Sequence, residues 1–278
     1  MRSGIRRFAR DYLPPAAIRL ASEFLDRFRG APFQFVGRTW PRELKVGGWE
    51  AEGVQDNREQ TWQSFRSSLE GTTLLGVSEA SLSFPGSVST DVQSLYLTYA
   101  YCLGLACHQK RVATVLDWGG SVGNYYLIAK RLFPEIEFQY TCVDLPATCA
   151  IGRRLLPEVT FHDDTSWQSA DYDFVFSSSS LQYLEDWRPT VAALAQSSRR
   201  YLCITRMPFV ISDSSFVAVQ HVKDYRTEYP GWILNRDEFV SFVESQGMRL
   251  LTQFVDHAGQ RIKDALEDNL YMGFLFEH

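Results

Sequence analysis

Residues 112–124 read VATVLDWGGSVGN, in which a β-branched run ends at Asp117 and passes directly into a glycine-rich turn. The run predicts a buried strand, and the next segment, NYYLIAKRLF at 124–133, predicts a helix. A strand, a tight turn and a helix in this order point the first amides of the helix at a ligand, and glycine permits the close approach. The stretch therefore indicates a nucleotide-type cofactor site, although glycine-rich turns also occur for packing alone.

The glycine spacing separates two kinds of cofactor site. The dinucleotide fingerprint G-x-G-x-x-G, placed on Gly120 and Gly123, would need glycine at Trp118. The segment instead resembles motif I of class I S-adenosylmethionine-dependent methyltransferases, with serine in place of the usual middle glycine. The resemblance implies that the cofactor is S-adenosyl-L-methionine and that its contacts include Asp117, Gly119, Gly120, Ser121 and Gly123.

A second acidic residue supports the same interpretation. Residues 138–146, FQYTCVDLP, place Asp144 at the end of the next apolar run, where a carboxylate can accept hydrogen bonds from both ribose hydroxyls. Aspartate is also a common turn former, so the glycine loop and Asp144 carry the argument together. The DLP triplet looks like that of small-molecule O-methyltransferases, which implies that Asp144 and Leu145 hold the ribose.

Two more strand ends fit this frame. Residues 159–161 are followed by His162, Asp163 and Asp164, and the resemblance implies that one of the two aspartates meets the adenine amino group. No metal-ligand spacing accompanies His162, so we expect no metal site. Residues 172–176 predict a buried strand that opens into Ser178 and Ser179 near the reactive methyl group, followed by a helix beginning near Leu181.

The remaining pattern predicts the fold class. A helix is expected from Thr90 or Asp91 to about His108, a strand at 201–205, a capping box at 235–238, and terminal strands at 250–255 and 271–276, with residues 257–269 as a loop. Alternating strands and helices imply an α/β, doubly wound Rossmann-like sheet. The methyltransferase resemblance implies that this sheet is mostly parallel, with an antiparallel last strand.

Composition limits the function classes. The chain has 278 residues with 45% hydrophobic content, enough for a large core, and its net charge of −5 argues against a nucleic-acid substrate. Its five cysteines form no C-x-x-C pair, which favours a reducing cytoplasm. Apolar runs are too short to span a bilayer, and no signal peptide with a cleavage-like site is present.

The N-terminal third differs from the rest. We place the one domain boundary near residue 85, with residues 1–85 as a helical extension that caps the active site and residues 86–278 as the S-adenosylmethionine-binding domain. A helix is expected near residues 59–69. Residues 1–30 carry seven arginines and an apolar stripe at Ala17, Leu20, Phe24 and Phe28. Peripheral contact with the inner face of the cell membrane, packing on its own domain and a homodimer all remain open.

Chemistry on a hydroxyl group needs a base, because an alcohol is a poor nucleophile until its proton is leaving. Many relatives have histidine where this chain has Gln182, so the base must lie elsewhere. His221 is the first choice because it follows the fifth strand, where this fold places substrate loops. Further candidates are Tyr183 for catalysis and acceptor contact, and Arg206, Tyr225 and Tyr229 for acceptor binding.

Flanking segments narrow the resemblance. The segments LPPAAIRL, LQYLEDW and YPGWILNRDEF look like those of methyltransferases encoded in bacterial surface-polysaccharide gene clusters. This implies O-methylation of a sugar or glycan hydroxyl, with a small-molecule or glycan acceptor. The alternative is a non-catalytic scaffold or cofactor-sensing subunit of a glycan-assembly complex. An NAD-dependent epimerase or dehydrogenase would need a different glycine pattern from the one at residues 119–123.

Overall fold

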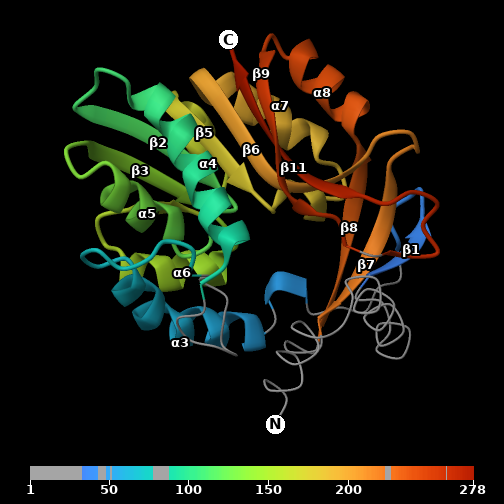
Figure 1. The fold of residues 1–278 in the computed structure, drawn as a ribbon, viewed down its shortest axis with the longest axis horizontal. Coiled ribbons are helices and arrows are strands. Elements are labelled where there is room, and N and C mark those ends of the chain that lie inside the picture. Colours follow the sequence, from blue (N-terminus) through green and yellow to red (C-terminus); the bar gives the residue numbers. More distant parts are fainter. Residues whose placement is uncertain (1–32, 43–47, 51, 78–87, 223–226, 261) are drawn as a thin grey trace, which may run out of the picture.

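The computed structural model describes residues 33–42, 48–50, 52–77, 88–222, 227–260 and 262–278 (Figure 1). Residues 1–30, for which membrane contact is expected, lie outside this set, as does Tyr225. In the described part of the chain, no helix combines the length and the hydropathy that crossing a bilayer requires.

The central sheet is mostly parallel, as predicted. Its parallel strands run in the order β4-β3-β2-β5-β6. They are β2 (Val112–Trp118), β3 (Glu137–Val143), β4 (Thr160–His162), β5 (Tyr172–Ser178) and β6 (Ser198–Val210). The last strand, β11 (Leu270–Glu277), lies antiparallel between β6 and β9 (Arg249–Ala258), which confirms the antiparallel last strand.

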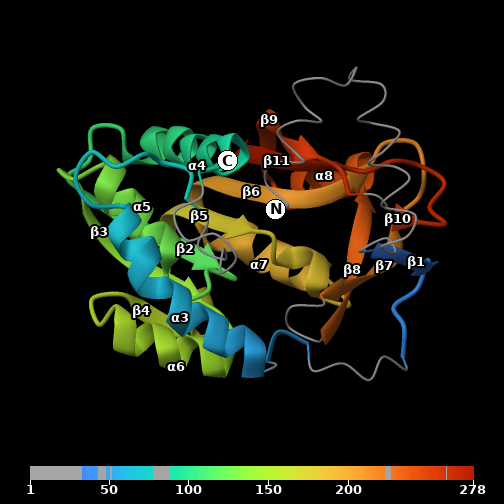
Figure 2. The ribbon, with the colours of Figure 1, turned by 60° about the horizontal axis from the view of Figure 1, so that its bottom comes forward.

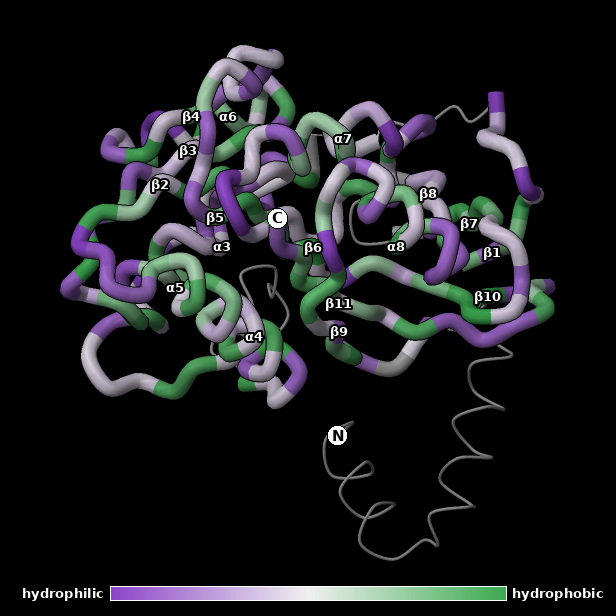
Figure 3. The backbone as a smooth tube through the Cα atoms, turned by 90° about the horizontal axis from the view of Figure 1, so that it is seen from above, coloured by the Kyte–Doolittle hydropathy of each residue, from purple (hydrophilic) through white to green (hydrophobic). Residues whose placement is uncertain are grey.

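Helices cover both faces of this sheet, and the burial of β5 shows why. Phe174 and Phe176 pack into one core cluster, and Val175 between them packs into the other, because successive strand residues point to opposite faces. The first cluster includes α4 (Thr90–Cys107), α5 (Asn124–Leu132) and α6 (Pro146–Leu155); the second includes α7 (Arg188–Ser197) and α8 (Arg236–Ser245). Hydrophobic stretches of β6 and β11 pass between these layers (Figure 3).

Of the predicted helix starts, that of α8 has its predicted cap, that of α4 is capped by Ser89 and not by Thr90 or Asp91, and a third lies later in the chain. The Asn235 side chain accepts the Glu238 amide at 3.0 Å, as expected, and α4 begins at Thr90 with Ser89 as its N-cap. The helix expected near Leu181 starts instead at Arg188, after a short 3₁₀ turn, η3 (Leu181–Tyr183). Proline fits the first turn of a helix, and Pro189 supplies that start.

A second group of strands extends the sheet beyond β6. β7 (Phe216–Val222) and β8 (Thr227–Asn235) form an antiparallel hairpin, and β8 joins β6 through Phe209 and Val210. β1 (Phe33–Gly37) pairs with β7 and with the short β10 (Ile262–Lys263). The expectation of a substrate loop around His221 was therefore wrong, and so was that of a continuous loop at 257–269. Both segments contain strand residues, because each pairs with a strand that lies far away in the sequence.

The helix expected near residues 59–69 begins earlier. It is α3 (Glu52–Ser68), preceded by the 3₁₀ turn η1 (Gly48–Glu50). Val54, Trp62 and Phe65 form its buried stripe at helical spacing. Figure 2 shows α3 lying beside α6, next to the carboxyl ends of the parallel strands.

Candidate functional site

One large cavity lies at the carboxyl ends of the parallel strands. Its volume is about 620 Å³, and α3 and η1 form the wall opposite the strand ends. Most of the sequence-predicted site residues line it: Gly119, Ser121, Asp144, Leu145, Asp163, Asp164, Ser178, Ser179, Tyr183 and Arg206. In open α/β sheets this edge is where ligands bind.

The glycine loop needs its glycines. Gly119 has a φ of +72°, and a Cβ there would lie 2.1 Å from the Ser180 hydroxyl oxygen. A Cβ on Gly120 would lie 2.5 Å from the Asp117 carboxyl carbon. Gly123 has a φ of +89° and is the N-cap of α5. The loop therefore approaches both the turn after β5 and its own strand more closely than a side chain allows.

Asp117 lies beneath this loop and is not part of the cavity wall. It is 1% exposed, and its carboxylate accepts a hydrogen bond from the Tyr140 hydroxyl at 2.9 Å. Burial raises the pKa of Asp117 to about 7; the Tyr140 hydrogen bond opposes this shift and the charge of Asp144 adds to it. The position makes Asp117 a support of the loop.

Asp144 and the glycine loop meet directly. The Ser121 amide donates to Asp144 Oδ2 at 2.9 Å, and the Leu145 amide donates to Oδ1 at 2.8 Å. Ser121 has a φ of +56°, in the left-handed region that glycine favours. Each carboxylate oxygen has two lone pairs, so both oxygens can still accept a hydrogen bond from a hydroxyl of a ligand in the cavity.

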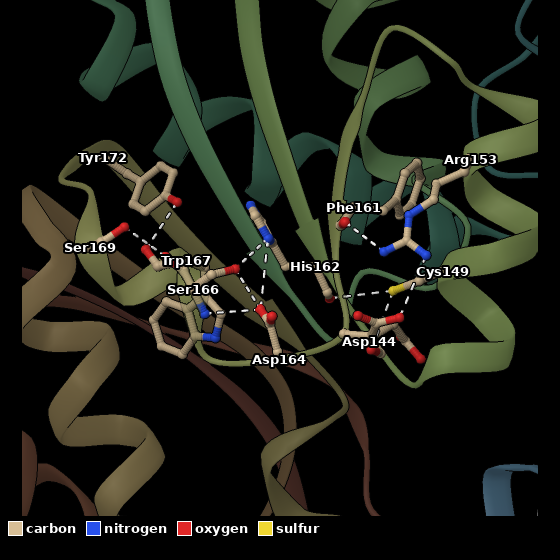
Figure 4. A network of polar contacts seen from close by, with 11 residues as sticks. Asp144, Cys149, Arg153, Phe161, His162, Asp164, Ser166, Trp167, Ser169 and Tyr172 are labelled. Carbon is tan, nitrogen blue, oxygen red and sulfur yellow. Dashed lines mark hydrogen bonds and ion pairs between the residues drawn. The ribbon is translucent and has the colours of Figure 1, made fainter.

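Figure 4 shows how the neighbouring strand end is held. The Cys149 thiol lies within 3.3 Å of the carbonyl oxygens of both Asp144 and His162, and so ties β3 to β4. Ser166 bonds to His162 Nδ1 and donates its amide to Asp164 at 2.9 Å. The Ser166 hydrogen bonds lower the pKa of Asp164, which keeps this cavity carboxylate ionised.

Asp163 lines the cavity and pairs with Arg153 at 3.5 Å. Among the residues that the structure describes, no cluster of three or more His, Cys, Asp or Glu side chains could hold a metal ion. All five cysteines are free and buried.

The fourth strand end connects β5, β6 and the glycine loop. The Ser180 hydroxyl donates to the Gly119 carbonyl at 3.2 Å, and the Ser179 amide donates to the Thr205 carbonyl at 3.0 Å. Gln182 is 3% exposed and donates to the Ser179 hydroxyl at 3.1 Å. Gln182 therefore supports this turn.

The sequence predicts that residues 1–85 cap the active site, but it singles out no cavity residue from α3. Asn57, Arg58, Thr61 and Trp62 line the cavity from this helix. Arg58 donates hydrogen bonds to Thr148 of α6 and to Gln55, and Glu59 forms an ion pair with Arg154 of α6. The buried stripe of α3 was the available signal, since its apolar positions need a partner surface.

An aromatic group forms the wall near Tyr183. Trp49 stacks on Tyr229 with ring centroids 4.2 Å apart and meets Tyr183 edge-on at 5.0 Å. Tyr229 is 2% exposed and supports Trp49 from behind, so it is Trp49 and Tyr183 that face the cavity. The Tyr183 hydroxyl donates to Gln220 Oε1 at 3.3 Å.

The two remaining candidates are less fully described. The backbone of His221 lies in β7, paired with Glu228 of β8, and its side chain is outside the described set. Tyr225 lies wholly outside it.

Comparisons with known proteins give structural matches only. No family model matches the chain, and no curated protein matches it. One similar solved structure is magnesium protoporphyrin IX methyltransferase from Synechocystis PCC 6803 with bound SAH, at 12% identity over 81% of this chain and 98% of that one, with a TM-score of 0.45.

Two further structures show the same range of similarity. The 1,6-didemethyltoxoflavin-N1-methyltransferase of Burkholderia thailandensis, with bound 1,6-didemethyltoxoflavin and S-adenosylhomocysteine, is 14% identical over 88% of this chain and 95% of that one, with a TM-score of 0.45. An S-adenosylmethionine-dependent methyltransferase from Clostridium acetobutylicum is 10% identical over 66% and 89%, with a TM-score of 0.44. At these identities the likeness concerns the fold alone.

The strand order of this chain defines the class. The parallel order β4-β3-β2-β5-β6, an antiparallel β11 between β6 and β9, and a glycine loop after β2 form a Rossmann-like α/β fold of the methyltransferase type. The cavity lies where such folds bind their ligands.

Proposed function

We propose that this protein is an S-adenosylmethionine-dependent methyltransferase that methylates a hydroxyl of a sugar or glycan in surface-polysaccharide biosynthesis. The observation that carries the proposal is the contact between the Ser121 amide and the Asp144 carboxylate at the edge of the cavity. This contact joins a glycine loop and a ribose-type carboxylate, the two parts of an adenosyl-cofactor site.

The cofactor would lie across the ends of β2, β3 and β4. Asp144 would accept hydrogen bonds from the ribose hydroxyls, and Asp163 or Asp164 would accept a hydrogen bond from the adenine amino group. The glycine loop and Ser121 would take the remaining polar groups of the cofactor. S-adenosylmethionine supplies a sulfonium methyl group, and binding here would direct that group toward Ser178 and Ser179 at the end of β5.

The protein would catalyse transfer mainly by alignment and by excluding water. The methyl carbon bonds to the acceptor oxygen as its bond to sulfur breaks, the electron pair stays on sulfur, and the acceptor proton passes to a base. The sequence-based candidate for this base is His221, although it lies in strand β7 and not in the loop expected for it, and the α3 wall would keep water from the reacting atoms. Loss of turnover in His221→Ala with intact S-adenosylhomocysteine binding would support the assignment.

Tyr183 would position the acceptor. Burial raises its pKa, with hydrogen bonding from Gln182 and the charge of Arg206 opposing the shift, so the phenol keeps its proton at neutral pH. Because the Tyr183 hydroxyl donates its proton to Gln220, its oxygen is left to accept a hydrogen bond from a hydroxyl substrate. Tyr183→Phe would then raise KM more than it lowers kcat.

The second candidate function is a non-catalytic scaffold or cofactor-sensing subunit. The buried Gln182 favours it, since this side chain fills the place of the histidine found in many relatives and supports a turn. Both functions require cofactor binding, so activity separates them.

The deciding experiment is a methyl-transfer assay with radiolabelled S-adenosylmethionine and a panel of sugar nucleotides and glycans. Acceptor-dependent formation of S-adenosylhomocysteine supports the enzyme and excludes the scaffold. Cofactor binding without product over the whole panel would favour the scaffold.

Membrane contact by residues 1–30 predicts that full-length protein, but not protein lacking these residues, co-sediments with anionic liposomes.

A further inference from the structure

Arg206 occupies an unusual backbone position beside the cavity. On β6, Thr205 and Arg206 lie between Ile204 and Met207, whereas only Gly273 lies between their partners on β11. Two residues opposite one make a β-bulge, and Arg206 within it has a φ of +57°. Bulges of this kind re-aim a side chain, and here the side chain lines the cavity.

Three neighbouring strands hold the bulge. The Arg206 amide donates to Asp256 Oδ2 at 2.6 Å, and Asp256 reaches it from β9 across β11. Asp256 is 6% exposed, and a Cβ on Gly273 would lie 3.3 Å from its Oδ1. A buried carboxylate and a glycine thus accommodate a strained arginine, an arrangement that indicates function.

The charges along the cavity wall divide by strand. The lining acids, Asp144, Asp163 and Asp164, follow β3 and β4, and Arg58 bonds to Thr148 of α6 near them. Arg206 comes from β6, on the other side of β5, next to Tyr183 and Trp49. Its positive charge acts on the hydroxyls of both Tyr183 and Tyr271 and opposes the rise that burial causes in their pKa.

We infer that the acceptor carries an anionic group, a carboxylate or a phosphate, which Arg206 binds while Trp49 and Tyr183 contact the body of the acceptor. The inference rests on the proposed function, because it takes the ends of β3 and β4 as the cofactor side. A guanidinium binds such anions through two parallel hydrogen bonds, and an aromatic wall suits the apolar face of a sugar ring.

The test uses full-length protein saturated with S-adenosylhomocysteine. Binding of D-glucuronate and D-glucose 6-phosphate is compared with that of D-glucuronamide and D-glucose by saturation-transfer NMR titration. At least one anionic sugar should bind about tenfold more tightly than its neutral partner, as expected for a charge-assisted hydrogen bond. The two anions separate carboxylate from phosphate recognition.

Variants attribute the preference to the residue. Arg206→Gln should remove it, Arg206→Lys should keep part of it, and Arg236→Gln, the same change on α8 outside the cavity, should leave it intact. Affinity for S-adenosylhomocysteine should change less than about twofold in Arg206→Gln. Circular dichroism checks that each variant is folded, and the wild-type comparison stands without any variant.

Three results would overturn the inference: equal or undetectable binding of charged and neutral sugars, a preference that survives in Arg206→Gln, or a loss of cofactor affinity in Arg206→Gln, which would assign the arginine to the cofactor carboxylate. Failure of wild-type protein to bind S-adenosylhomocysteine would instead reject the proposed function.

Discussion

Ser121 adopts a left-handed backbone where the related motif has glycine. A non-glycine residue in this region is strained, so Ser121→Gly should raise the free energy of unfolding by about 0.5–1 kcal/mol. Its amide would still donate to Asp144, and cofactor affinity should be retained. Urea unfolding measures the first effect and calorimetry the second.

Ser121→Ala is the matched control, because it removes the hydroxyl and keeps the strain. It should be no more stable than the wild type. Equal stability of the glycine and alanine variants would contradict this account of the loop.

The buried Asp117 should make stability depend on pH. Its pKa is raised, so the folded state holds a proton that the unfolded state releases between about pH 4 and about pH 7. Its contribution to stability is therefore greatest at low pH and falls as pH rises through this window, by at most about 1.4 kcal/mol per pH unit.

Asp117→Asn keeps the acceptor for Tyr140 without the titrating charge. Urea unfolding from about pH 5 to pH 7 should show the wild type losing stability relative to this variant. Parallel stability curves for the two proteins would mean that Asp117 ionises freely in the folded state.

The sequence indicated the proposed cofactor side of the site better than the proposed acceptor side. Gly119, Ser121 and Asp144 form a local pattern with a defined chemical use, and the structure brings them to one cavity edge. Asp117 belongs to the same motif, and its burial beneath Gly120 depends on three-dimensional packing that the spacing does not encode.

Helix α3 closes the cavity through contacts with α6. Arg58→Ala removes the hydrogen bond to Thr148 and part of the cavity wall, so affinity for S-adenosylhomocysteine should fall about tenfold. Arg66, exposed on the same helix, provides the control, and Arg66→Ala should bind like the wild type. Equal affinities for both variants would mean that α3 does not contact the cofactor.

Most elements of the central sheet could be predicted because each has its own periodicity or cap. Strands β2 and β5 contain short apolar runs, and Asn235 marks the start of α8. The β7–β8 hairpin could not be predicted from the sequence, since Pro230 and Gly231 within β8 resemble a turn. β1 and β10 depend on pairing with residues far away in the sequence.

Cofactor binding should stabilise the whole molecule. A ligand present at about 100 times its Kd adds about 2.7 kcal/mol to the free energy of unfolding when it binds only the folded state. For a chain of this size, the midpoint temperature of thermal unfolding should rise by roughly 5–10 °C with S-adenosylhomocysteine. Differential scanning fluorimetry measures this shift, and NAD at the same concentration should give none.

The acceptor depends on features that neither pattern nor fold specifies. The fold supports many acceptors, and the wall formed by Trp49, Tyr183 and Arg206 combines η1, η3 and a bulge in β6. None of these three elements has a sequence signature of its own. Acceptor identity therefore needs direct measurement.

The central claim is that Asp144 and the glycine loop hold an adenosyl cofactor. Titration calorimetry of S-adenosylmethionine, S-adenosylhomocysteine and NAD with wild type and Asp144→Ala tests it, with Asp171→Ala as an exposed control. The account predicts that both adenosyl ligands bind the wild type and the control, and bind Asp144→Ala at least about tenfold more weakly. Binding of NAD alone, or adenosyl binding unchanged by Asp144→Ala, would contradict it.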